Sequence, residues 1–221
     1  MAFDSALGQR IGGSWGTIAT LASVDGTATH SLPRALTAAL AAKRDLADAV
    51  HALCALHGRH PGVIDHAVVH NRQDTAQDWL EAAAYGFTVE RAYLARLTAL
   101  AGPLPSTPGQ AESEAAITGQ RHALDMLAQS DRTGCATGAA ITLVLDWAAI
   151  RTMLDAAAVR FGIDPPDSIL PDDMETASLV SALSETPAIE RAMAFGAQQI
   201  LAQHRGLWDL LEARAGARNH Q

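Results

Sequence analysis

Apolar residues recur every three or four positions along most of the chain, the spacing that places them on one face of an α-helix. This pattern predicts about five long helices, over residues 31–57, 74–100, 108–130, 135–161 and 187–215, and two short ones, over 62–70 and 174–183. Residues 1–30 are rich in Gly, Ser and Thr and are expected to form an irregular N-terminal arm, and residues 217–221 a tail. We therefore expect an all-α, antiparallel helical bundle that forms a single domain over residues 31–216.

Capping residues support several of these helix boundaries. Thr107 stands three residues before Gln110, and Asp74 three residues before Gln77, the spacing of a capping box at a helix N-terminus. Gly162 follows the predicted fourth long helix and is a favourable residue for the end of a helix. The loops between the long helices are mostly short, which favours antiparallel neighbours.

Composition agrees with a helical protein and excludes several classes of function. Hydrophobic residues make up 48% of the chain and charged residues 18%, the net charge is −8, and the sequence pI is about 5.5. This acidic balance argues against nucleic acid and anionic membrane surfaces as partners. Asp146 interrupts the longest apolar segment, and the first residues lack the basic start of a secretory signal, so we expect a soluble, cytoplasmic protein.

Four polar side chains fall on the apolar faces of the predicted helices, when each helix is projected at about 100° per residue. Glu90 lies in a stripe of apolar residues, and a buried carboxylate costs several kcal/mol unless it is paired, protonated or bound to a metal. His57 and His204 lie on the inner faces of their helices, and Asp146 is the only charge in "AAITLVLDWAAI". We predict His57, Glu90 and His204 as metal ligands, and Glu90 and Asp146 as catalytic residues. The structural alternatives are an ion pair of Glu90 with an arginine and a hydrogen-bonded core histidine at position 204.

Three further residues are weaker candidates for the same core site. Lys43 and Gln120 project onto inner faces and are predicted to contact a cofactor. Cys135, at the start of a strongly apolar helix, is a candidate nucleophile, and the alternative is a small buried apolar residue. The projection places Asp48 and His51 at the edge of the apolar face, near solvent.

Long antiparallel helices with polar residues turned inward resemble ferritin-like carboxylate proteins and the haem-oxygenase-like group that includes the TenA-type proteins. The ferritin-like resemblance implies iron or another divalent metal, but the chain has no E-x-x-H pair, which argues against a di-iron centre. The haem-oxygenase-like resemblance implies a haem with an early-helix histidine, His57 or His51, as its axial ligand. The TenA-type resemblance implies a core cysteine acting with carboxylates, which would be Cys135, Glu90 and Asp146. The segment "QQILAQHRGLWDLLEAR" also resembles an uncharacterised bacterial family, which implies no function.

Two hypotheses for function follow from these residues. The first is a bundle with a metal- or small-molecule-binding site in its core, oxidoreductase-like if it holds iron or another divalent metal, with haem less expected. The second is a non-catalytic bundle that binds a small ligand or forms a homodimer, in which the inward polar groups form a closed hydrogen-bond network. The sequence leaves open whether the protein is an enzyme.

Overall fold

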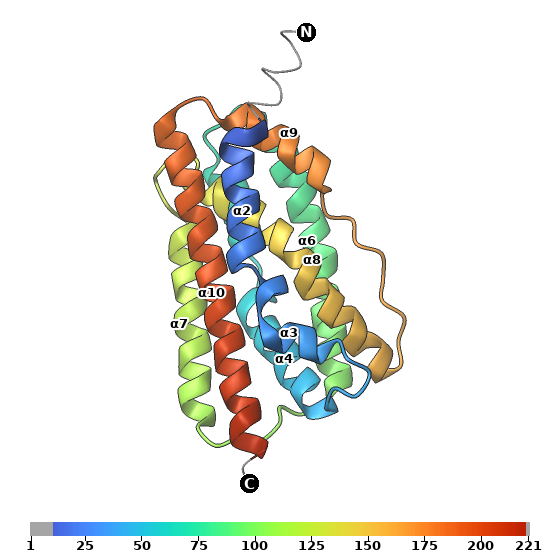
Figure 1. Ribbon diagram of the computed structural model, residues 1–221. Coiled ribbons are helices and arrows are strands. Elements are labelled where there is room, and N and C mark those ends of the chain that lie inside the picture. Colours follow the sequence, from blue (N-terminus) through green and yellow to red (C-terminus); the bar gives the residue numbers. More distant parts are fainter. Residues whose placement is uncertain (1–10, 220–221) are drawn as a thin grey trace.

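The computed structural model describes residues 11–219, and this part of the chain folds into nine α-helices without a strand (Figure 1). In chain order they are α2 (Gly16–Asp25), α3 (Ser31–Leu36), α4 (Lys43–His57), α5 (Val63–His70), α6 (Gln77–Ala101), α7 (Gln110–Ala128), α8 (Cys135–Phe161), α9 (Asp173–Leu183) and α10 (Pro187–Asn219). A π-helical turn at Ile11–Trp15 and 3-10 turns at Thr27–Thr29 and Asp74–Ala76 complete the elements. The predicted all-α bundle is confirmed.

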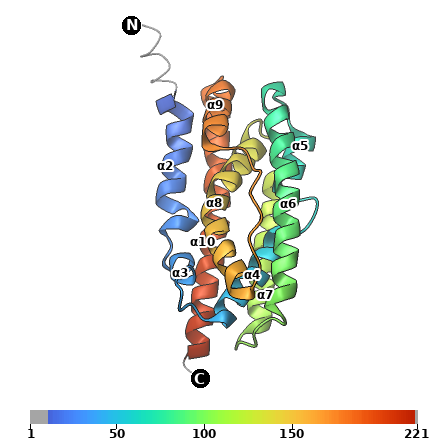
Figure 2. The same ribbon diagram turned by 90° about the vertical axis from the view of Figure 1, so that its right-hand side faces the viewer.

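Helix α8 forms the centre of the bundle. All its residues from Cys135 to Val144 are buried, and it contacts each of the helices α2 to α7 as well as α10. Figure 2 shows α2 and α3 on one side of α8 and α10, and α5 and α6 on the other. In the described residues, α8 is the one helix whose length and composition would suffice to cross a membrane, but 78% of its most apolar stretch is buried inside the bundle. Burial among other helices is typical of a core helix.

Helices α8 and α10 pack closely because a glycine of each faces the backbone of the other. A Cβ atom on Gly138 would lie 2.3 Å from the carbonyl oxygen of Met193, and one on Gly196 would lie 2.2 Å from that of Cys135. Side chains at these two positions would push the helices apart. The two glycines therefore fix the distance across which side chains of α8 and α10 can meet.

The predicted helix over residues 31–57 is two helices, α3 and α4, separated by residues 37–42. The hydroxyl of Thr37 donates to the carbonyl of Arg34 at 2.7 Å, which closes the end of α3. Leu40 in the break is 96% exposed, although the apolar pattern continues through it. Because the helix restarts at Lys43, that side chain is exposed, and its predicted inner position is wrong.

The predicted irregular arm and tail are also helical where the structure describes them. Helix α2 packs against α10 and buries Ile18, which is 1% exposed. This helix is short and bordered by glycines, and Ile18 is its one deeply buried residue. Its sequence therefore shows too few regularly spaced apolar positions to predict a helix. Helix α10 continues to Asn219, beyond the predicted end at 215, because Arg218 is bound to Asp48 on α4. Positions 1–10 of the arm and 220–221 of the tail lie outside the described residues.

The predicted helix ends agree in part with the structure. Gly162 ends α8 with a φ of 85°, the left-handed conformation expected of a C-terminal glycine. Helix α7 begins at Gln110 after Gly109, which has a φ of 71°, and no side chain caps this helix. Thr107 is buried and accepts a hydrogen bond from Arg218 at 2.8 Å, so its predicted capping role is wrong.

Candidate functional site

Three buried side chains from three helices form one continuous chain of hydrogen bonds through the core. Asp146 of α8 lies 2.6 Å from Nδ1 of His204 on α10. Nε2 of His204 lies 3.0 Å from Nε2 of His57, the last residue of α4. The exposed fractions are 4% for Asp146, 1% for His204 and 5% for His57. The structure thus brings together three of the predicted site residues.

The segment before α3 holds the carboxylate end of this chain. The backbone N–H of Thr27 donates to Oδ1 of Asp146 at 2.7 Å, and the Thr27 hydroxyl donates to Oδ2 at 2.6 Å. The indole N–H of Trp208 donates to the same hydroxyl at 2.9 Å. A Cβ atom on Gly26 would lie 2.8 Å from Oδ1 of Asp146, so glycine permits this close approach. Thr27 was not predicted as a site residue, because it lies in the segment expected to be irregular.

Burial and hydrogen bonding set the charges of Asp146 and His57, the two ends of the chain of hydrogen bonds. Burial alone would raise the pKa of Asp146, but hydrogen bonds from His204 and Thr27 lower this pKa below its usual range, so the group is a carboxylate. Burial lowers the pKa of His57 well below its usual value, and the neighbouring His204 lowers it further. The His57 ring is therefore neutral at physiological pH.

Only one arrangement of protons satisfies both hydrogen bonds when both rings are neutral. Nδ1 of His204 must carry the proton that it donates to the Asp146 carboxylate, which leaves Nε2 of His204 as an acceptor. Nε2 of His57 must then donate to it, and Nδ1 of His57 keeps a free lone pair. With His204 neutral, the chain of hydrogen bonds therefore orients both rings and leaves Nδ1 of His57 as the basic nitrogen at its end, whereas a protonated His204 would donate from Nε2 to His57 instead.

His57 lines a pocket of about 160 Å³, which we call the His57 pocket. Its walls come from the α4–α5 connection, α6 and α7, and they combine apolar side chains, including Phe87 and Leu124, with Arg59 and Arg121. The His57 ring also packs edge-on against Trp147, with ring centroids 5.5 Å apart. Apolar walls with a few converging polar groups are typical of small-molecule sites.

Asp146, at the opposite end of the chain of hydrogen bonds, lines a different cavity of about 490 Å³ beside α3. This cavity also contacts Pro33 and Thr152 and is mostly apolar. The chain of hydrogen bonds thus joins two cavities with different linings. Its His57 end lies at the smaller cavity, the His57 pocket.

Glu90 is fully buried, as predicted, but it belongs to a different cluster. Its carboxylate accepts hydrogen bonds from Arg151 at 2.7 Å, from the Trp147 indole at 3.0 Å and from Ser168 at 3.0 Å. The structural alternative, an ion pair with an arginine of the bundle, is therefore the correct one. Trp147 touches both clusters, because its indole N–H donates to Glu90 while its ring packs against His57.

The predicted metal centre does not form from the expected residues. No group of three or more His, Cys, Asp or Glu side chains within residues 11–219 is arranged to hold a metal ion. The predicted grouping of His57, Glu90 and His204 around one ion is therefore wrong. The carboxylate of Glu90 bonds Arg151, and the facing nitrogens of the two histidines bond each other.

The remaining predicted residues lie apart from the His57 pocket. Cys135 is fully buried and stands eleven residues before Asp146 on α8, about 16 Å along the axis at about 1.5 Å per residue, so the predicted convergence of these two residues is wrong. Gln120 is partly buried, as its projection suggested, but its amide donates to the backbone oxygen of Gln203 on α10 at 3.1 Å. Lys43 is exposed at the start of α4.

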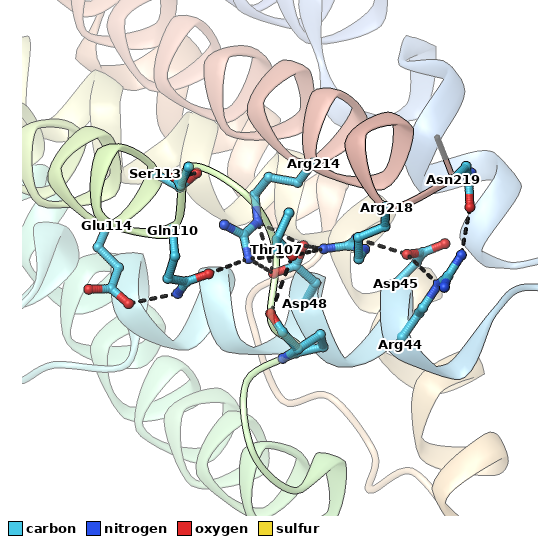
Figure 3. A network of polar contacts seen from close by, with 12 residues as sticks. Arg44, Asp45, Asp48, Thr107, Gln110, Ser113, Glu114, Arg214, Arg218 and Asn219 are labelled. Carbon is cyan, nitrogen blue, oxygen red and sulfur yellow. Dashed lines mark hydrogen bonds and ion pairs between the residues drawn. The ribbon is translucent and has the colours of Figure 1, made fainter. Parts of the chain in front are cut away.

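A second buried polar network was missed by the sequence reasoning. Asp48 is 2% exposed, which corrects its predicted position at the edge of the helix face. Figure 3 shows Arg214 and Arg218 extending from α10 to Asp48 on α4. Arg214 binds both carboxylate oxygens, with its closest contacts at 2.9 Å, and Arg218 binds Oδ2 at 2.6 Å and Asp45 at 2.8 Å. We call Asp45, Asp48, Thr107, Arg214 and Arg218 the Asp48 cluster. The i, i+4 spacing of Arg214 and Arg218 places both arginines on one face of α10, and this pattern is the sequence feature that could have indicated a shared acidic partner.

Comparison with known proteins places the chain in a family. Residues 22–219 match the family of unknown function DUF6975, and the chain belongs to this family. No curated protein and no solved structure gives a significant match to it. The family assignment covers every helix of the site, including the segment that contributes Thr27.

Proposed function

We propose that the protein binds a small molecule in the His57 pocket and exchanges a proton with it through His57. The observation that carries this proposal is the continuous chain Asp146–His204–His57, which ends at a pocket with a neutral imidazole. Core histidines that only stabilise a fold need neither a buried carboxylate behind them nor a cavity in front of them.

The chemistry follows from the order of the groups. Nε2 of His57 is occupied by His204, so Nδ1 is the nitrogen that accepts a proton from the bound molecule. As it does so, the proton on Nε2 passes to Nε2 of His204, and the resulting imidazolium remains paired with the Asp146 carboxylate. The positive charge thus lies next to a buried negative charge. This arrangement stabilises the transition state of a proton transfer.

The lining of the pocket indicates the kind of molecule that fits. Arg59 and Arg121 place two cationic side chains at the pocket against one carboxylate, that of Asp125, while Phe87 and Leu124 provide apolar contact. At about 160 Å³ the pocket is similar in size to the about 150 Å³ apolar cavity known to hold benzene. A compact molecule with an unsaturated or aromatic body and an electronegative substituent fits both the volume of the pocket and its mixed apolar and cationic lining.

The base-promoted ring opening of 5-nitrobenzisoxazole tests this proposal without knowledge of the natural substrate. In this reaction a base removes the proton on C3, the electrons form a C≡N bond, and the N–O bond breaks to release a phenolate that is measured by its absorbance. A positioned general base contributes about 10²- to 10⁴-fold to such a step. We expect saturable acceleration by the wild-type protein at pH 7.5.

His57→Gln removes the base, and His122→Gln, on the exposed surface of α7, is the matched control. The proposal predicts that His57→Gln lowers the rate by about 10²-fold or more, while His122→Gln keeps the wild-type rate. Equal rates for the wild type and His57→Gln, with both folded, would refute it. No saturation by the wild type would equally refute it, because the pocket would then not admit a compact aromatic molecule of the proposed kind.

A further inference from the structure

A buried guanidinium nitrogen in the Asp48 cluster has no acceptor. Arg214 is 5% exposed, and its Nε and Nη2 atoms are bound by Asp48 and Gln110. Its Nη1 atom is buried and lacks a hydrogen-bond partner within the described part of the chain, residues 11–219. Buried polar groups are almost always paired, and an unpaired donor on a charged group is especially costly. Such an atom requires an explanation.

The unpaired nitrogen belongs to a side chain that lines a pocket of about 260 Å³ between α4 and α7, the Arg214 pocket. Figure 3 shows this nitrogen directed away from Asp48, toward the first turn of α7 with Gln110 and Ser113. Ala52, Leu104 and Ile117 supply apolar walls. The pocket therefore has apolar walls beside a charged hydrogen-bond donor that is buried and has no acceptor.

The two acidic residues of the pocket already accept hydrogen bonds from other side chains. Asp48 is bound by two arginines, and Glu114 accepts a hydrogen bond from the side-chain amide of Gln110 at 2.6 Å. Gln110 in turn accepts from Nη2 of Arg214 at 2.9 Å, which holds the guanidinium in place. A further anion at Nη1 would thus meet an oriented donor without having to displace an existing partner.

We infer that the Arg214 pocket binds an apolar monocarboxylate, whose carboxylate accepts from Nη1 of Arg214 while its hydrocarbon part fills the apolar walls. Hydrogen bonds between guanidinium and carboxylate are charge-assisted and stronger than neutral ones. The volume exceeds the about 150 Å³ of a cavity that holds benzene, so a six-membered ring or a medium-length alkyl chain fits. This site is separate from the His57 pocket, although Arg121 borders both.

Calorimetric titration with octanoate and with octanamide tests the inference. The carboxylate and the amide share one hydrocarbon chain and differ in charge. We expect saturable binding of one octanoate per chain, and at least about tenfold weaker binding of octanamide, since hydrogen bonds to charged groups contribute more than neutral ones. Equal binding of the two compounds would overturn the assignment of an anion site. Absence of octanoate binding would also overturn it, because the unpaired nitrogen would then be satisfied by water.

Variants that fill the pocket without touching the Asp48 cluster locate the site. Ala55→Trp places an indole at the lining of the pocket, and Ala115→Trp, exposed on α7 and outside the lining, is the matched control. We expect at least about tenfold loss of octanoate affinity in Ala55→Trp and none in Ala115→Trp or His57→Gln. Equal affinity in both tryptophan variants would refute the location. Retention of octanoate binding by His57→Gln distinguishes this site from the proposed proton-transfer site.

Discussion

Replacement of His57 by glutamine should make the stability of the protein less dependent on pH. His57 is 5% exposed, and burial together with His204 lowers its pKa well below the usual value. Glutamine retains an N–H group that can donate to Nε2 of His204, but it does not titrate. The variant therefore removes the titration of one buried imidazole while it preserves polar contact with the chain of hydrogen bonds.

The sign and size of the effect follow from linkage between proton binding and folding. Below its ordinary pKa of about 6.5, the His57 ring takes up a proton in the unfolded chain but not in the folded protein. Its neutral burial thus favours the folded state at higher pH, and this contribution is lost as the pH falls from about 6.5 toward the lowered folded pKa. The slope is at most about 1.4 kcal/mol per pH unit. Between pH 7.5 and pH 5 the loss has an upper limit of about 2 kcal/mol for one ring.

Urea unfolding of the wild type, His57→Gln and His122→Gln, measured at intervals from pH 7.5 to pH 5, gives the required free energies. The difference in stability between the wild type and His57→Gln should shrink by up to about 2 kcal/mol as the pH falls, with most of the change below pH 6.5. The exposed control His122→Gln should follow the wild-type curve. Parallel curves for the wild type and His57→Gln would refute the conclusion that His57 is buried in its neutral form.

Two further substitutions test the packing around the site, each by urea unfolding. Glu90→Gln should lower stability by about 1.5–3 kcal/mol, because it removes a buried charged partner of Arg151 and leaves that side chain paired only with Asp155, and a loss below about 1 kcal/mol would contradict a contribution from the Glu90 pair. Gly196→Ala should cost about 1–3 kcal/mol, because the new Cβ would lie 2.2 Å from the carbonyl oxygen of Cys135. The matched control Gly216→Ala, also on α10 but with open space around it, should instead stabilise the helix by about 0.5–1 kcal/mol, and equal effects at the two glycines would refute the close contact.

Much of the fold could be predicted from apolar periodicity and from residues at helix ends. The boundaries of α8 agree with the prediction because it is long, strongly apolar and ended by Gly162. The break between α3 and α4 was missed because Leu40 continues the apolar pattern although its side chain is 96% exposed. Helix α2 was missed because it is short and buries only Ile18 completely. Periodicity reports which face is buried on average, and it fails where one helix ends and another restarts in register.

The sequence identified the buried polar residues of the candidate site, but it did not show which of them contact one another. Inward projection identified His57, Glu90, Asp146 and His204, and all four are buried. Projection places each residue on one helix, whereas the partners come from contacts between helices that a single sequence does not show. Glu90 consequently appeared to belong with the histidines, although Arg151 neutralises it.

The burial of Asp48 could not be predicted from its own helix. At the edge of an amphipathic face an aspartate is expected to reach solvent, yet two arginines of α10 cover it. This covering depends on where the last helix crosses α4, which is a tertiary feature. A polar residue at a helix edge is therefore not assigned to the surface by its own helix alone.

The most direct test of the proton chain is a long-range ¹H–¹⁵N correlation spectrum of the histidine rings, recorded between pH 8 and pH 5. We expect protonated Nδ1 in His204 and protonated Nε2 in His57, with Nδ1 of His57 unprotonated at the start of the titration. The His57 signals should stay those of a neutral ring as the pH falls past about 6.5. A His57 ring that carries protons on both nitrogens at pH 7, or one whose Nε2 is unprotonated, would refute the proposed direction of the hydrogen bonds.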